Sequence, residues 1–174
     1  MSGDDVSDSD VSDNDPSNDD VSGGAPGAKD SGEGGRHRGR EVALQVLYAI
    51  DLASDEGGTS RDLQEQVFAR IVENFDVPRP AEKFARELVA GVAERIDGLD
   101  EILGIHARNW RVSRMAAVDR NVLRLAVYEL RDSDIPVAVV IDEAVDLAKR
   151  FGADSSPAFV NGVLDAVARE VRAA

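Results

Sequence analysis

Three arginines and a histidine gather where an apolar helical pattern begins, in a chain whose formal net charge is -14. They are Arg36, His37, Arg38 and Arg40. Exposed cations at a helix N-terminus face the positive end of the helix dipole, which costs roughly 0.3 to 1 kcal/mol each. A bound anion would reverse that penalty, because arginine forks and free N–H groups at a helix start both bind phosphate. We therefore predict a site for nucleic-acid phosphates here, with a solvated basic edge of a polar tail as the alternative.

Two aromatic side chains have the chemistry to stack on unpaired bases. Tyr48 lies off the apolar face formed by Ala43, Val46, Leu47 and Ile50, which favours a surface role. Phe159 lies near the start of the last predicted helix, in a mostly small and polar stretch. Periodicity alone leaves Phe159 either a core anchor or a stacking platform.

A third group of polar residues falls in the segment Val118-Asp119-Arg120-Asn121-Val122-Leu123-Arg124. We expect Asp119, Arg120 and Arg124 to project outward from a helix, as a solvated face or as a polar surface for a partner.

The residue types argue against catalysis and against a metal centre. The chain has no cysteine and only two histidines, far apart in the sequence, so we expect no metal. Glu143 and Asp146 resemble a carboxylate pair, but no candidate nucleophile or histidine lies near them in sequence. No strand precedes a glycine-rich phosphate loop. We therefore expect a binding protein with no cofactor, not an enzyme.

Residues 1–35 differ in composition from the rest of the chain. They contain nine aspartates and Glu33 against Lys29 alone, and few apolar residues. Such a composition cannot bury enough apolar surface to fold, so we predict a disordered acidic tail before a domain at 36–174. The tail is either solubilising or an acidic mimic that competes with nucleic acid for the basic segment. No apolar run is long enough for a membrane span and no signal peptide is evident, which favours the cytoplasm.

From Arg40 onward, apolar residues recur at spacings of three and four, which predicts an all-helical domain. We expect helices at about 39–53, from Thr59 or Ser60 to a break at Pro78 and Pro80, and from 81 to 96, with a short one at 99–103 after a turn at Gly98. Three more are expected: from a cap at Ser113 to 130, at about 141–151 ending at a left-handed Gly152, and from a cap at Ser156. Gly91 and Gly162 interrupt helical patterns, where a second helix is expected to approach closely.

The chain resembles the NusB family of bacterial transcription antitermination factors over residues 36–172. The resemblance rests on the arginine-rich start followed by Glu41-Val42-Ala43-Leu44-Gln45-Val46-Leu47-Tyr48, and on Asn109-Trp110. It extends through Val118-Asp119-Arg120-Asn121-Val122-Leu123-Arg124-Leu125-Ala126 and Phe159-Val160-Asn161-Gly162-Val163-Leu164-Asp165. It implies two small helical bundles in one compact domain, with no catalytic activity.

The resemblance also implies partners and contact residues. NusB-like proteins pair with NusE, a ribosomal protein, and bind single-stranded boxA RNA. With other Nus factors they act on RNA polymerase, chiefly in ribosomal RNA operons. By position in the motif, Arg36, Arg38 and Arg40 are implied RNA contacts, and we add His37, Tyr48, Arg120 and Phe159. We assign Asp119 and Arg124 to the NusE surface.

The chain departs from the family pattern at two places. His37 stands where the family often has arginine, so the charge there varies with pH. Ser155, Ser156 and Pro157 replace a more charged stretch before Phe159.

Two alternatives remain open at this level. A NusB-like domain also precedes the catalytic domain of certain ribosomal RNA methyltransferases, so this chain is alternatively an accessory domain in RNA modification. A helical homodimer that masks its RNA surface is the other alternative.

Overall fold

The computed structural model describes residues 31–54 and 60–173, and its ordered elements are all helical, as predicted. In chain order they are α1 (Ser31–Ala53), α2 (Arg61–Asn74), α3 (Arg79–His106), the short 3-10 helix η1 (Val112–Arg114), α4 (Ala117–Asp132), α5 (Val137–Phe151) and α6 (Ser156–Ala173). None of the described helices combines the length and apolar character that crossing a membrane requires.

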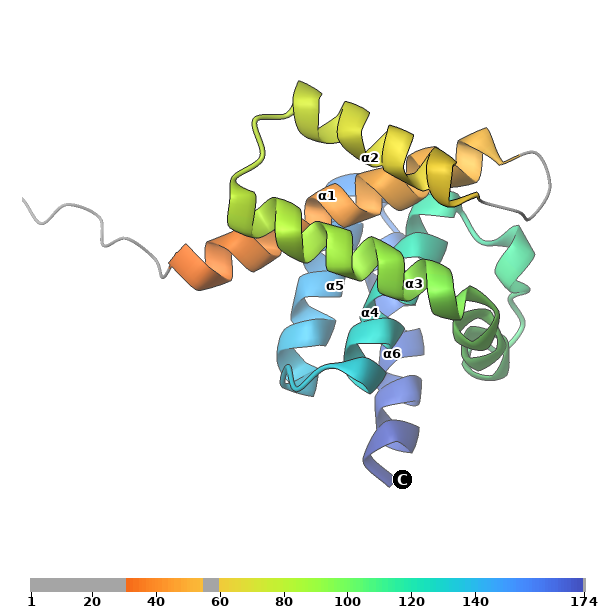
Figure 1. Cartoon of the computed structure of the whole chain (residues 1–174). Helices are drawn as coiled ribbons and strands as arrows, with labels where there is room; N and C mark the ends of the chain where they lie inside the picture. The colour runs from red at the N-terminus through yellow and green to blue at the C-terminus, as the bar shows by residue number, and fades with distance from the viewer. Residues whose placement is uncertain (1–30, 55–59, 174) are drawn as a thin grey trace, which may run out of the picture.

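The helices form two groups that share one core (Figure 1). Helices α1, α2 and α3 lie together in the upper part of the view, and α4, α5 and α6 lie below them. Helix α4 joins the groups, because it contacts α1, α3, α5 and α6. This arrangement confirms the expected two small bundles within one domain.

The apolar spacing explains which faces are buried. On α3, Leu88, Val92, Leu99 and Leu103 recur at helical spacing and are all buried. Helix α4 is buried on nearly all sides, which its central position requires.

Two helix boundaries differ from the sequence prediction in ways that matter for the site. Helix α1 begins at Ser31, eight residues before the predicted start, so residues 31–35 of the predicted tail are helical. The rest of that tail, residues 1–30, lies outside the described residues. Helix α3 is continuous through Gly98, where a turn was predicted, because glycine lowers helix stability without ending a well-packed helix.

The predicted caps have mixed outcomes. Ser60 caps α2 and accepts a hydrogen bond from the Leu63 N–H at 3.2 Å, whereas Thr59 lies outside the described residues. Ser113 lies in η1 instead of capping α4, which starts after Ala116. Helix α5 starts at Val137, earlier than predicted, and its C-cap Gly152 has a φ of -92°, so it is not left-handed. Ser156 is the first residue of α6 and not its cap.

The two interrupting glycines also have different outcomes. At Gly91 an added Cβ would collide with the Tyr128 ring, which confirms the predicted close approach, here between α3 and α4. At Gly162 an added Cβ would meet no atom within 4 Å, so the prediction of a second helix there is wrong.

Candidate functional site

The basic residues of the predicted phosphate site lie inside α1 and not at its N-terminus. Because the helix begins at Ser31, Arg36 is already in its second turn. The free N–H groups of the helix start are therefore not beside these side chains. Arg36 is exposed, and no ion pair joins it to a side chain within residues 34–54 or 60–170.

Arg40 is not a surface cation. Its guanidinium makes a bidentate pair with Glu129 of α4, with Nη2 to Oε1 at 2.8 Å and Nε to Oε2 at 2.9 Å. The two residues are 3% and 2% exposed. Arg40 also lies over the Phe84 ring. The pair ties α1 to α4, so the prediction that Arg40 is exposed at a helix mouth is wrong.

The carboxylate of Glu41 interacts with three neighbouring basic side chains. Its buried carboxylate accepts a hydrogen bond from Arg38 at 2.8 Å, lies 3.4 Å from His37 and forms an ion pair with Arg150 of α5. His37 Nδ1 is also 2.7 Å from Glu143, which lies 3.5 Å from Arg40. Half-exposed His37 and Arg38 thus keep part of their surface toward solvent while their partners hold them in place.

Sequence reasoning missed the roles of Glu41 and Glu129 in this network, and it considered Glu143 only as a pair with Asp146 and not as the partner of His37 and Arg40. One signal was available. Arg40 precedes Ala43 and Leu47 by three and seven residues, which places it on the apolar face of α1. A cation on a core face needs a buried acidic partner.

The polar residues of α4 are also held by acidic partners. Arg124 donates two hydrogen bonds to Asp100 of α3, at 2.6 and 2.7 Å, and is 7% exposed. Arg120 and Asn121 both donate to Asp51 of α1, at 2.7 and 2.9 Å. The expectation that Arg120 and Arg124 project outward is therefore wrong, because the surrounding helices leave α4 almost no solvent-facing side.

Asp119 and Tyr48 lie nearer the surface. Asp119 is half-buried, and within the described ranges its Oδ1 has no hydrogen-bond partner. Tyr48 is 39% exposed, which confirms the predicted surface position.

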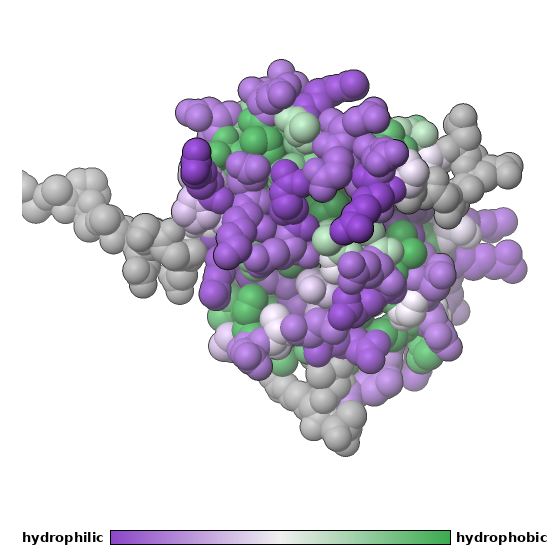
Figure 2. Space-filling model, viewed as in Figure 1, coloured by the Kyte–Doolittle hydropathy of each residue, from purple (hydrophilic) through white to green (hydrophobic). Residues whose placement is uncertain are grey.

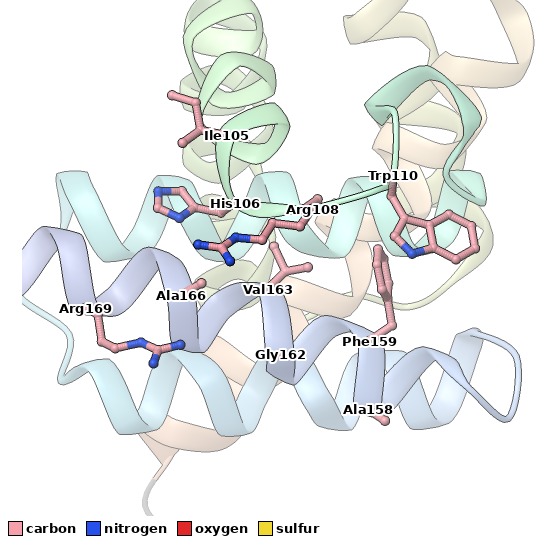
Figure 3. A pocket seen from close by; sticks show the side chains of 11 residues that line it. Ile105, His106, Arg108, Trp110, Ala158, Phe159, Gly162, Val163, Ala166 and Arg169 are labelled. Atoms are coloured by element: carbon pink, nitrogen blue, oxygen red, sulfur yellow. The ribbon is translucent and has the colours of Figure 1, made fainter.

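Phe159 lines an open groove of about 740 Å³ between α6 and the segment where α3 ends (Figure 3). Its ring makes an edge contact with Trp110, with centroids 5.6 Å apart. The structure does not bring Phe159 into the charged network around Glu41. Elsewhere, the face in Figure 2 is mainly hydrophilic, with small separate apolar areas.

The described side chains show no group of three or more His, Asp or Glu residues suited to holding a metal ion. In the charged clusters, cations are paired with carboxylates. This arrangement can stabilise the fold and can bind a charged partner.

Comparison with known proteins decides the relationship. The family model described as NusB family matches residues 37–169. The chain belongs to the NusB family. Transcription antitermination protein NusB of Myxococcus xanthus is 46% identical over 136 residues, which is 78% of this chain and 95% of that protein. The protein of the same name from Anaeromyxobacter dehalogenans strain 2CP-1 is 50% identical over 76% of this chain and 89% of its own length.

Solved NusB structures have the same fold. T. maritima NusB is 37% identical with a TM-score of 0.68, over 78% of this chain and 91% of that chain. A chain in the crystal structure of antitermination factors NusB and NusE with double-stranded RNA is 31% identical with a TM-score of 0.68. That match covers 78% of this chain and 97% of the other.

Proposed function

We propose that this chain is an antitermination factor that binds boxA RNA together with NusE and helps RNA polymerase read through terminators. The observation that carries the proposal is the match of nearly a whole chain from a structure of NusB and NusE with double-stranded RNA, which supports binding to NusE and to RNA. The antitermination proteins of the family match this chain over nearly their full length, which supports the same role. Other Nus factors and RNA polymerase then act together with the RNA-bound complex of this chain and NusE.

Surface cations of α1 supply the phosphate contacts in this proposal. Arg36 is exposed and has no carboxylate partner among the side chains of residues 34–54 and 60–170, so it offers its guanidinium to RNA. Arg38 and His37 are partly exposed and are oriented by Glu41 and Glu143. An RNA phosphate near them would add charge-assisted hydrogen bonds without needing to order the side chains first.

Arg40 and Arg120 contribute to RNA binding as positioning residues. Arg40 fixes α1 against α4, and Arg120 fixes α4 against Asp51 near the end of α1. Tyr48 and Phe159 supply stacking surfaces for unpaired bases. An aromatic side chain can stack on any base. Sequence preference would therefore come from the base edges that the complex of this chain and NusE contacts.

Asp119 is our nominee for direct contact with NusE. The residue is half-buried in the first turn of α4; because its Oδ1 is buried, a contact with NusE would use the part of the residue that solvent reaches. Arg124 supports that surface by tying α4 to Asp100.

The proposed role requires binding and no catalytic step. A protein that acts on nascent transcripts in bacteria works in the cytoplasm, and we place this chain there.

The direct test titrates a labelled single-stranded boxA-type RNA and a scrambled RNA of the same composition with the full chain. Each titration is run with and without NusE. We expect NusE to increase affinity for the boxA-type RNA more than for the scrambled RNA. Equal affinities for both RNAs in the presence of NusE would reject the proposal. Size-exclusion chromatography of the same mixtures shows whether free chain self-associates and releases a partner when RNA is added.

A further inference from the structure

His37 has a carboxylate beside each of its ring nitrogens. Nδ1 lies 2.7 Å from Glu143 Oε2 on α5, and Nε2 lies 3.4 Å from Glu41 Oε1 on α1. A neutral imidazole carries hydrogen on one nitrogen only, so one of the two contacts would set a nitrogen lone pair against a carboxylate oxygen. Only the imidazolium can donate to both carboxylates. We call these two contacts the His37 bridge.

The bridge lies where the packing of α1 begins. Among the described side chains, His37 is the first on α1 that an ion pair joins to another helix. Before it, an added Cβ at Gly34 or Gly35 would meet no atom within 4 Å, and Figure 1 shows the first turns of α1 extending past the neighbouring helices. Two residues after it, Gly39 is buried against α3. The bridge therefore ties down the part of α1 that packing does not hold.

The charged groups around the bridge balance one another. They come from α1, α4 and α5 and form one network of three carboxylates and three guanidinium groups: Glu41, Glu129, Glu143, Arg38, Arg40 and Arg150. Their formal charges cancel. His37 therefore decides whether the network is neutral or carries one positive charge.

Loss of the histidine proton would uncover a carboxylate. Glu41 would keep its contacts with Arg38 and Arg150. Glu143, whose side chain is 22% exposed, would keep only the ion pair with Arg40 at 3.5 Å. A carboxylate left facing solvent beside the surface cations of α1 repels phosphate. The start of α1 would also lose its connection to α5.

We propose that the His37 bridge makes RNA binding by this chain sensitive to pH. The imidazolium ties the start of α1 to α5 and neutralises Glu143; as pH rises and the proton is lost, the bridge opens and RNA affinity falls. Histidine is the side chain whose charge ordinarily changes between about pH 5 and pH 8. Arginine, which the family pattern often has at this position, stays charged and would give no such response. The inference rests on the proposed function and adds its regulation.

The first test measures the affinity of the full chain with NusE for boxA-type single-stranded RNA at about pH 6 and about pH 8. We expect the affinity of the intact chain to fall about 2- to 30-fold between these two values. His37→Arg should show no fall, because a guanidinium keeps its charge. His106→Gln removes the chain's other histidine, which pairs with Glu170, and should retain the pH dependence. An equal fall in His37→Arg and in the intact chain would reject the inference.

The second test separates the bridge from the charge of Glu143 alone. Removing a carboxylate near a bound phosphate should by charge alone strengthen RNA binding, and Asp142→Asn, which removes an exposed neighbouring carboxylate, measures that effect. Glu143→Gln should instead weaken binding at about pH 6, because glutamine lacks the charge that holds the imidazolium. In a His37→Gln background, Glu143→Gln should no longer weaken binding. Strengthening by Glu143→Gln equal to that by Asp142→Asn would contradict the role of the bridge.

A third measurement observes the bridge without RNA. The chain has no cysteine, so Gly34→Cys and Ala138→Cys, both at exposed positions, provide the attachment points for two spin labels on α1 and α5. Electron paramagnetic resonance gives the distribution of distances between the labels. We expect a narrow distribution at about pH 6 and a broader one at about pH 8, with His37→Arg narrow at both. Identical distributions at the two pH values for the chain with His37 would reject the opening of the bridge.

The outcomes separate this inference from the proposed function. If the chain with NusE binds boxA-type RNA equally well at both pH values, the inference is rejected and the antitermination role stands. If no RNA binds at either pH, the proposed function and the pH response of RNA binding both fall. The spin-label distances then still decide whether His37 holds the start of α1 on α5.

Discussion

Arg40 of α1 and Glu129 of α4 face each other as a bidentate ion pair that solvent hardly reaches. The arginine belongs to a segment that the sequence marks as basic, but its charge is used inside the fold. The basic segment therefore has two parts: Arg36, His37 and Arg38 reach the surface, and Arg40 fixes the helix that carries them.

Breaking the buried pair should destabilise the domain. Arg40→Met leaves the Glu129 carboxylate buried without its partner, which costs about 3 to 5 kcal/mol of unfolding free energy. Urea denaturation measures this loss. The double variant Arg40→Met with Glu129→Leu should recover most of it, because two apolar side chains replace two charges. An Arg40→Met variant as stable as the intact chain would show that the pair does not hold α1 in place.

The exposed arginines should affect RNA binding and not folding. With Arg36→Gln and Arg38→Gln combined, we expect weaker binding and a salt dependence shallower by about 0.7 for each lost phosphate contact. Affinity measured across a salt series gives the slope. Arg70→Gln, which removes an exposed cation from α2, is the matched control and should leave the slope unchanged. A double variant with the slope of the intact chain would assign the phosphates to other residues.

Replacing a helical glycine by alanine should stabilise the domain where the added Cβ meets no other atom. Gly98→Ala adds a methyl group that meets no atom within 4 Å and improves helix propensity, so we expect a gain of about 0.5 to 1 kcal/mol. Gly91→Ala is the opposite case, since its Cβ collides with Tyr128 and should destabilise the fold. Thermal unfolding compares the two. Equal melting temperatures for both variants would contradict the packing described for α3 and α4.

The acidic segment at the N-terminus should reduce nonspecific RNA binding. Residues 1–30 contain nine aspartates and one lysine, and their charge repels phosphate near Arg36. Deleting them should raise affinity for scrambled RNA, most strongly at low salt, where screening is weakest. A variant with these aspartates changed to asparagine keeps the segment length and should behave like the deletion. Unchanged affinity for scrambled RNA in both variants would leave the segment with a solubilising role only.

The periodicity of apolar residues was sufficient to predict the helical class. Local signals also located Ser60 as a cap and Gly91 as a point of close helix contact. They placed the start of α1 too late, because residues 31–35 have a tail-like composition and the helix continues into them from a well-packed segment.

The roles of the charged residues were harder to predict, because they depend on partners distant in sequence. Arg40 and Glu129 are 89 positions apart, and Arg124 and Asp100 are 24 apart. Spacing along one helix cannot show that α4 is enclosed by its neighbours, so its arginines were expected at the surface. Trp110 was noticed as part of a family motif, but its contact with Phe159 emerges only when the segment between α3 and η1 lies against α6.

The central claim is that the chain promotes read-through by RNA polymerase, and reconstituted transcription tests it most directly. The template carries a boxA element upstream of a terminator, and NusE and the other Nus factors are present in every reaction. The measured quantity is the fraction of transcripts that pass the terminator, with the chain added or omitted. We predict a larger read-through fraction when the chain is added, and a loss of that increase when boxA is scrambled. A read-through fraction that is the same with and without the chain would contradict the account.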